Sequence, residues 1–213
     1  TPLYSSAASD VYKRQSEVRN RLDLLVIVGP GVASLFPRFY ERCVFPAETL
    51  FGGDVRQRQI VLLGAAAEDV AAATEAARAA KAAKPVAIDC DPADLTAAVA
   101  ALRALLGGRR IPESAAAGPP LAELEDLSGR MRTARYGVIA WVAAALDGGT
   151  GELVVGAICD MLRDLNLRTR FSGLPLAGAD NGIGANQVCT WQTGLPLRTS
   201  FARGHPDHDA WRF

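Results

Sequence analysis

The feature that most constrains the fold is a repeated alternation of short, continuous apolar runs with segments of helical periodicity. A run that is apolar throughout predicts a strand buried on both faces, as in a parallel sheet. The first three runs are Leu22–Val28, Gln59–Leu63 and Pro85–Ile88. Helical segments follow them at Val32–Arg42, Glu68–Lys84 and Pro92–Leu106. This order favours an α/β protein with helices on both faces of the sheet.

The same rhythm restarts after Arg109–Pro120, a Pro-, Gly- and Ala-rich stretch that is typical of a linker. Helices are expected at Leu121–Thr133 and Gly151–Leu165, and strands at Tyr136–Val142 and Leu167–Phe171. We therefore predict a three-layer αβα protein with mostly parallel sheets, divided into α/β units at 16–112 and 113–213. The second unit ends in a Gly/Asn-rich loop of the kind that binds cofactors.

Composition excludes several classes of protein. The 23 basic residues balance the 23 acidic ones, so nucleic acid is not an expected partner. No apolar run approaches the roughly 18–20 residues of a membrane span. The four cysteines show no CxxC spacing, which argues against a zinc site or a disulfide framework. Residues 1–15 share no pattern with the rest and resemble a translated cloning adaptor, and we expect a piece of a longer chain.

Two glycine-containing segments could bind a cofactor. Gly29 and Gly31 follow the first strand, where a nucleotide could bind. In the second segment, paired glycines before a short helix could let backbone N–H groups approach a phosphate or a polar ring. The second segment precedes and opens a short helix, and its amide side chains could read a heterocycle edge. Its candidate residues are Asn181, Gly182, Gly184, Asn186, Gln187 and Thr190. The alternative for the second segment is a tight turn capped by Asn, which composition alone favours. The segment lacks the third glycine of a Rossmann fingerprint.

Residues 186–194 read NQVCTWQTG, and residues 201–206 read FARGHP. This combination resembles the B component of formylmethanofuran dehydrogenase, a member of the molybdopterin oxidoreductases, in which N-Q-V-x-T-W-Q-T-G precedes F-S-R-G-Y-P. Weaker similarity covers Leu24–Pro30, residues 135–139 (RYGVI) and residues 162–166 (LRDLN). The resemblance implies a formate dehydrogenase/DMSO reductase-like fold over Leu22–Phe213.

The resemblance implies two alternative roles. In methanogenic archaea the family's enzyme carries tungsten or molybdenum on a molybdopterin guanine dinucleotide, with an iron–sulfur cluster, and interconverts CO2 and formate. In methylotrophic bacteria the related component resembles a scaffold that has lost this cofactor. It belongs to a cytoplasmic formyltransferase/hydrolase complex with formyltransferase-like and amidohydrolase-like subunits.

Three departures from the family pattern favour the bacterial role. Gly29-Pro30-Gly31 replaces a polar Gly-x-Asn-Pro turn, His205 stands where the family has Tyr, and residues 207–210 lack the family's R-Y-N-P-G-E continuation. In the archaeal role, Arg203 of the F-A-R-G segment is the candidate catalytic residue, because a guanidinium fork suits formate. A surface ion pair of Arg203 with Asp207 or Asp209 is the alternative.

A rival hypothesis is an independent enzyme that binds NAD or another nucleotide at Gly29–Gly31 or Gly182–Gly184. It requires an acidic ribose partner, for which Asp54 has roughly the right spacing from the first loop. The remaining reactive residue types suggest no site. We expect His205 and His208 to face solvent rather than hold a metal, Cys189 to be an inert buried thiol, and Arg168 and Arg170 to face solvent or a partner.

Overall fold

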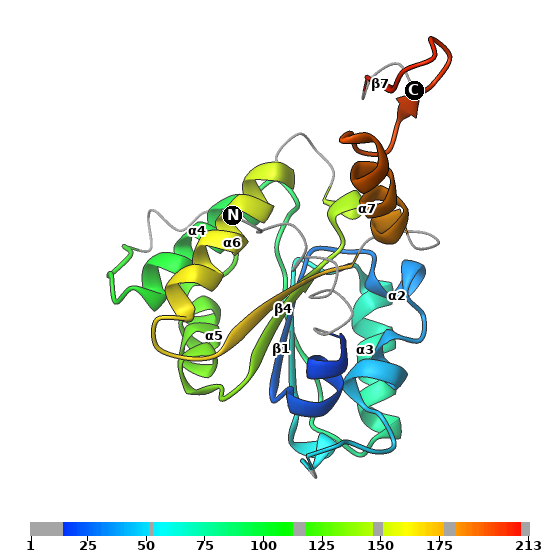
Figure 1. Ribbon diagram of the computed structural model, residues 1–213. Coiled ribbons are helices and arrows are strands. Elements are labelled where there is room, and N and C mark those ends of the chain that lie inside the picture. The colour runs from blue at the N-terminus through cyan, green and yellow to red at the C-terminus, as the bar shows by residue number, and fades with distance from the viewer. Residues whose placement is uncertain (1–14, 52, 113–117, 147–150, 177–181, 210–213) are drawn as a thin grey trace.

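Five parallel strands in the order β3-β2-β1-β4-β5 form the central sheet of the computed structural model (Figure 1). The structure describes residues 15–51, 53–112, 118–146, 151–176 and 182–209. The strands are β1 (Leu24–Val28), β2 (Gln59–Leu63), β3 (Val86–Ile88), β4 (Gly137–Trp141) and β5 (Phe171–Pro175). A separate antiparallel pair is formed by β6 (Thr199–Ser200) and β7 (Asp207–His208).

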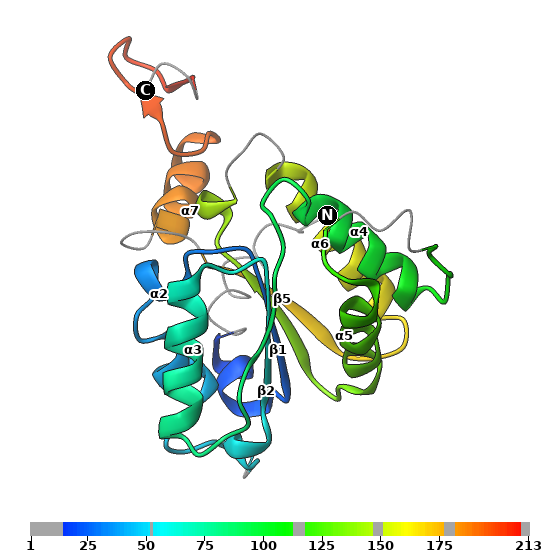
Figure 2. The same ribbon diagram turned by 180° about the vertical axis from the view of Figure 1, so that it is seen from behind.

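The helices cover both faces of the sheet, as Figures 1 and 2 show. They are α2 (Val32–Leu35), α3 (Ala67–Ala79), α4 (Leu95–Leu106), α5 (Leu121–Thr133), α6 (Gly151–Leu165) and α7 (Gly182–Thr193). Short helical turns are η1 (Tyr40–Val44), η2 (Val55–Gln57) and η4 (Ala143–Ala145), and residues 15–21 are also helical. Helices α4, α5 and α6 lie on one face, and α2 and α3 on the other. The predicted α/β class with parallel strands is confirmed.

Alternate residues of the buried strands supply the two cores. On β1, Leu24, Val26 and Val28 pack in the core under α4, α5 and α6, whereas Leu25 and Ile27 pack in the core on the α2 and α3 side. All five residues of β1 are buried. A strand covered on both faces needs apolar residues at every position, which explains the continuous run in the sequence.

The central pair of strands joins the two segments that the sequence suggests as separate units. β1 pairs in parallel with β4, with Leu24 opposite Gly137 and Val28 opposite Trp141. Residues on both sides of the expected boundary at 112/113 thus share one sheet. The stretch 109–120 connects α4 to α5, and its residues 113–117 lie outside the described part, as do residues 1–14 of the expected adaptor segment.

Four of the five predicted strands are confirmed, and the fifth was misplaced. β5 begins at Phe171, while residues 167–170 belong to the connection after α6. The sequence hides this strand because Gly173 and Pro175 interrupt its pattern, although both fit an edge strand. Gly173 is packed closely, and a Cβ there would lie 2.7 Å from the Leu162 side chain.

The first predicted helix was also wrong in extent. The segment Val32–Arg42 holds only the single turn α2, followed by the separate π-helical turn η1. Pro37 lies between them and cannot donate the backbone hydrogen bond that a continuous helix requires.

Replacing Gly137 should test the packing of β4 against β5. A Cβ on Gly137 would overlap the ring of Phe171, the residue opposite it on β5. We expect Gly137→Ala to lower the free energy of unfolding by about 1–3 kcal/mol, as overpacked core sites do. A Cβ added to Gly156 on α6 would meet no atom within 4 Å, so Gly156→Ala should raise the free energy of unfolding by up to about 1 kcal/mol. Urea titrations of both variants measure this, and equal effects would contradict the packing described.

Candidate functional site

The strand order places the first candidate turn where α/β proteins usually bind ligands. The chain leaves β1 toward β2 on one side, and β4 is added on the other side of β1. A crevice therefore forms outside the carboxyl ends of β1 and β4, at the point where the strand order reverses. Gly29 and Gly31 follow β1 at this edge, and η4 follows β4.

The backbone of the Gly29–Gly31 turn requires glycine. Gly29 has a φ of 79° and Gly31 a φ of 100°, both in the left-handed region that side chains disfavour. Neighbours also fill the space that side chains would need. A Cβ on Gly29 would overlap the Leu146 side chain, and one on Gly31 would lie 2.9 Å from the Ala145 Cβ. The turn is thus covered by apolar atoms that follow β4.

The amide groups of this turn already hold an anion, the carboxylate of Asp69. Gly31 donates its backbone N–H to Asp69 Oδ2 at 2.9 Å, and Ala33 donates to Oδ1 at 2.6 Å. Asp69 is fully buried and lies in the first turn of α3, where the helix dipole also favours a negative charge. Both carboxylate oxygens are therefore satisfied by the amide groups at the start of α2.

Tyr40 lies on the same side of the sheet, with its hydroxyl near this carboxylate. Burial, with a smaller contribution from Asp69, raises the pKa of the Tyr40 hydroxyl above its usual range. Within the described residues the hydroxyl oxygen has no hydrogen-bond partner. Tyr40 therefore contributes a neutral, apolar contact rather than an ionisable group.

These contacts test whether the turn can hold the phosphates of a pterin dinucleotide. A phosphate bound at such a turn takes its hydrogen bonds from the same N–H groups that Asp69 occupies. A phosphate beside the buried Asp69 carboxylate would also repel it in a medium of low dielectric. The residues present at Gly29 and Gly31 do not fit a bound dinucleotide.

A cavity of about 620 Å3 lies near this turn, at the start of α6. It is lined by Ala143, Leu146, Gly151, Glu152, Val155 and Gly156. Among the described residues, this lining offers one acidic side chain and no basic one.

Cys90 lies at the same edge of the sheet and is buried. Burial raises the pKa of its thiol to about 11, and the neighbouring aspartates contribute to the same shift. The thiol is therefore protonated at neutral pH and is not an activated nucleophile.

The second candidate set lies on α7, beyond the carboxyl ends of the strands and away from the sheet (Figure 1). Asn186 accepts the backbone N–H of Leu197 at 2.7 Å through Oδ1, and the Thr190 hydroxyl donates to the Asn186 carbonyl at 2.8 Å. The Asn186 side chain thus holds the segment that follows α7, whereas the Thr190 hydrogen bond lies within the helix. Gly184 and Gln187 are half-buried on the same helix. Asn181 lies outside the described residues, and Gly182 begins the helix.

Arg203 lies on the turn between β6 and β7 and faces solvent. Its Nη1 lies 3.6 Å from Asp207 Oδ2, and its side chain is 65% exposed. This is the surface ion pair that the sequence offers as the alternative to a catalytic role. On the same hairpin, the His208 ring nitrogen Nδ1 lies 3.1 Å from the Arg198 carbonyl oxygen.

Cys189 is half-buried rather than buried, and its Sγ lies 3.5 Å from the Pro196 carbonyl oxygen. Trp191 on the same helix is 85% exposed. Among the residues that the structure describes, no group of three or more His, Cys, Asp or Glu side chains could hold a metal ion.

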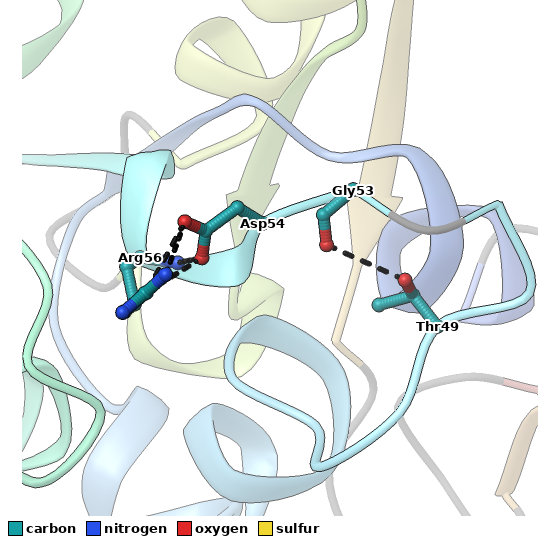
Figure 3. Close-up of polar contacts among 4 residues, drawn as sticks. All are labelled: Thr49, Gly53, Asp54 and Arg56. Atoms are coloured by element: carbon teal, nitrogen blue, oxygen red, sulfur yellow. Dashed lines mark hydrogen bonds and ion pairs between the residues drawn. The ribbon is translucent and has the colours of Figure 1, made fainter.

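The acidic partner that the nucleotide hypothesis needs lies at the wrong end of the sheet. Asp54 precedes β2 and caps η2, where its Oδ1 accepts the Arg56 N–H at 3.0 Å. Figure 3 shows its carboxylate paired with the Arg56 guanidinium, with Nη2 to Oδ2 at 2.9 Å. Since β1 and β2 are parallel, Asp54 lies at the opposite edge from Gly29. At the carboxyl end of β2 the chain continues with Gly64, Ala65 and Ala66, none of them acidic.

Sequence reasoning missed Asp69, the residue that decides what this turn can bind. Glu68 and Asp69 both look like acidic residues in the first turn of an alanine-rich helix. The burial of Asp69 and the exposure of Glu68 follow from the position of α3 beside α2. The only sequence signal is that Asp69 shares a helical face with the buried Ala73 and Ala77.

Removing the charge of Asp69 should destabilise the protein. In Asp69→Asn an amide NH2 would face one of the two backbone N–H donors, so one hydrogen bond to a charged acceptor is lost. We expect the free energy of unfolding to fall by about 2–3 kcal/mol in urea titrations. The matched control is Glu68→Gln, whose exposed side chain should change it by less than about 0.5 kcal/mol. Equal effects of the two substitutions would contradict the described role of Asp69.

Comparisons with known proteins give a consistent set of relatives. No protein-family model matches the chain. The B component of the formyltransferase/hydrolase complex Fhc of Methylorubrum extorquens is 38% identical over 128 residues, which cover 60% of this chain and 32% of the relative. The B components of the tungsten-containing formylmethanofuran dehydrogenase 2 of Methanococcus maripaludis and of Methanocaldococcus jannaschii are 26% and 27% identical, over 91% of this chain and 42% of each relative.

The fold is similar to a chain in the crystal structure of the formyltransferase/hydrolase complex FhcABCD of Methylorubrum extorquens, determined with methylofuran. The TM-score is 0.64 at 28% sequence identity, over 93% of this chain and 48% of that chain. The chain spans about a third to a half of the length of these relatives. The resemblance found in residues 186–206 thus extends over most of the chain, which is similar to the B components of the formyltransferase/hydrolase and formylmethanofuran dehydrogenase complexes.

Proposed function

We propose that the chain is part of the B component of a formyltransferase/hydrolase complex in one-carbon metabolism, where it acts as a scaffold. The 38% identity to the B component of the Fhc complex supports this assignment, as does the structural similarity to a chain of that complex. In this role the formyl group is transferred and hydrolysed by formyltransferase-like and amidohydrolase-like partner subunits. The chain itself supplies surfaces for assembly.

The observation that carries the scaffold role is the buried carboxylate at the turn after β1. Asp69 binds the Gly31 and Ala33 N–H groups that a dinucleotide phosphate would need. Leu146 and Ala145 cover the same turn with apolar atoms. A redox subunit of this family requires molybdopterin guanine dinucleotide with tungsten or molybdenum, and the turn is not built to hold it.

The alternative function is that of a catalytic subunit that interconverts CO2 and formate. The tungsten-containing relatives support it, because their similarity covers 91% of the chain. In that case the pterin nucleotide would depend on other residues, such as those of α7. Arg203 forms an exposed ion pair with Asp207, whereas a side chain that holds formate faces a closed cavity, so this alternative requires the rest of the subunit to cover Arg203.

The five-stranded sheet has a place in this proposal. We propose that the sheet and its flanking helices form one αβα part of a larger subunit with a formate dehydrogenase/DMSO reductase-like fold, in a cytoplasmic complex. Within the described residues no helix is long and apolar enough to cross a membrane.

Metal analysis of the complete protein that contains this chain separates the two functions. The scaffold role predicts no stoichiometric molybdenum or tungsten after purification of the complex, since the turn after β1 holds Asp69 instead of a phosphate. Elemental analysis by inductively coupled plasma mass spectrometry measures this. About one molybdenum or tungsten atom per chain would establish the dehydrogenase function instead.

Replacing Arg203 tests, at a single residue, whether the chain acts as a scaffold or as a catalytic subunit. In a scaffold, Arg203→Lys should keep the rate of formyl hydrolysis by the assembled complex within about twofold of wild type. It should also change stability by less than about 0.5 kcal/mol, because exposed ion pairs contribute little. Size-exclusion chromatography establishes that the complex is assembled. A loss of hydrolysis above about tenfold in an intact complex would contradict the scaffold role.

A further inference from the structure

A large cavity lies at the amino edge of the sheet, opposite the edge where the glycine turn lies. Its volume is about 660 Å3, within the range of small-molecule sites. Its walls come from the residues just before β1, β2, β4 and β5, from the carboxyl end of α5 and from the loop before η2. The arginines that line it are Arg21, Arg58, Arg130, Arg135 and Arg170.

The acidic residues of the cavity already have hydrogen-bond or ion-pair partners. Asp23 accepts the backbone N–H groups of Arg135 at 2.7 Å and Tyr136 at 3.0 Å. Asp54 is paired with Arg56, which is not a lining residue (Figure 3). The described walls therefore hold five arginines against two aspartates, and the side chains of those aspartates bind other groups.

Arg58 is a cation buried in the wall of the cavity. Its residue is 4% exposed, and it donates from Nη1 to the carbonyl oxygens of Cys43 and Val44 and from Nη2 to that of Arg19. Burial lowers the pKa of its guanidinium to about 10, so it remains charged at neutral pH. Within the described residues it contacts no carboxylate. A buried charge that only dipoles compensate is costly, and an anion in the cavity would offset that cost.

The other arginines leave donors free for such an anion. The Arg21 guanidinium lies 4.6 Å from the centre of the Phe51 ring, a stacking contact that leaves its N–H edge available. Neither Arg135 nor Arg170 forms an ion pair with another described residue, and both are exposed at the cavity. Arg130 is the exception, because Asp126 and Gln59 hold its guanidinium at 2.7 and 3.0 Å.

The carboxyl end of α5 opposes this field. The helix ends at Thr133 beside the cavity, where its dipole places the equivalent of about half a negative charge. That contribution is smaller than the excess of positive side chains. The net potential at the cavity therefore favours an anion.

We propose that this cavity is a binding site for a phosphorylated small molecule. Several arginines line one cavity, and a guanidinium fork matches the oxygens of a phosphoryl group, which accepts hydrogen bonds in pairs. The volume admits a ligand larger than a single phosphate ion. The site is independent of the glycine turn and of the scaffold role, since it lies at the other edge of the sheet.

Titration of the 213-residue chain with inorganic pyrophosphate tests the proposal by isothermal calorimetry. We expect saturable binding with a dissociation constant below about 1 mM at low ionic strength. Arg135→Gln and Arg170→Gln should each weaken binding by at least about fivefold, because each removes a charged donor pair. Circular dichroism melting curves establish that the variants are folded. Arg58 is left unchanged in this series because it also holds three backbone carbonyls.

Arg168→Gln is the matched control, because Arg168 lies two residues from Arg170 and does not line the cavity. It should keep the dissociation constant within about twofold. Three results would overturn the proposal. These are no saturable binding to the wild-type chain, equal losses in Arg168→Gln and Arg170→Gln, and equal affinity for citrate, which would indicate general attraction of anions.

Discussion

The carboxylate of Asp69 lies between α3 and the turn after β1, and the arrangement of the carboxyl edge depends on it. It accepts the N–H groups of Gly31 and Ala33, which have no helical partner at the start of α2. In related architectures an external anion satisfies such groups, whereas here the chain supplies its own. Because the charge is fully buried and doubly hydrogen bonded, removing it leaves two donors without an equivalent acceptor.

This contact gives the two edges of one sheet different chemistry. At the carboxyl edge, Leu146 and Ala145 lie against the glycine turn, and the described lining of the nearby cavity holds no basic residue. At the amino edge, the arginines before β2, β4 and β5 line an open cavity. At the edge that usually binds nucleotides in this topology, the glycine turn holds Asp69, whereas the opposite edge holds the excess of positive charge. A scaffold that has lost a redox cofactor is consistent with this inversion.

The sequence predicts the buried part of the fold well, because burial on both faces leaves a continuous apolar run. For that reason the strands Leu24–Val28 and Gly137–Trp141 can be predicted from the sequence. Strand β5 cannot be predicted in this way. Close packing accounts for Gly173 and the edge position of β5 accounts for Pro175, and the local sequence pattern reveals neither the packing nor the position. The site is harder still. Asp69 and Glu68 are neighbouring acidic residues in the same helical turn, and only the side of α3 on which each lies makes one buried and the other exposed. Arg170 and Arg58 line one cavity only because β2 and β5 run parallel in the same sheet.

Asp69 occupies the anion position of the turn after β1. Amide spectra of the 15N-labelled chain, recorded while guanosine diphosphate is added, test it most directly, since this probe carries the guanine nucleotide and phosphates of the family's cofactor. We expect the Gly31 and Ala33 resonances to stay unshifted and both amides to exchange slowly with solvent in the wild-type chain. Saturable shifts of these two amides, or rapid exchange at both, would show that the turn is open to a phosphate and that Asp69 does not occupy it.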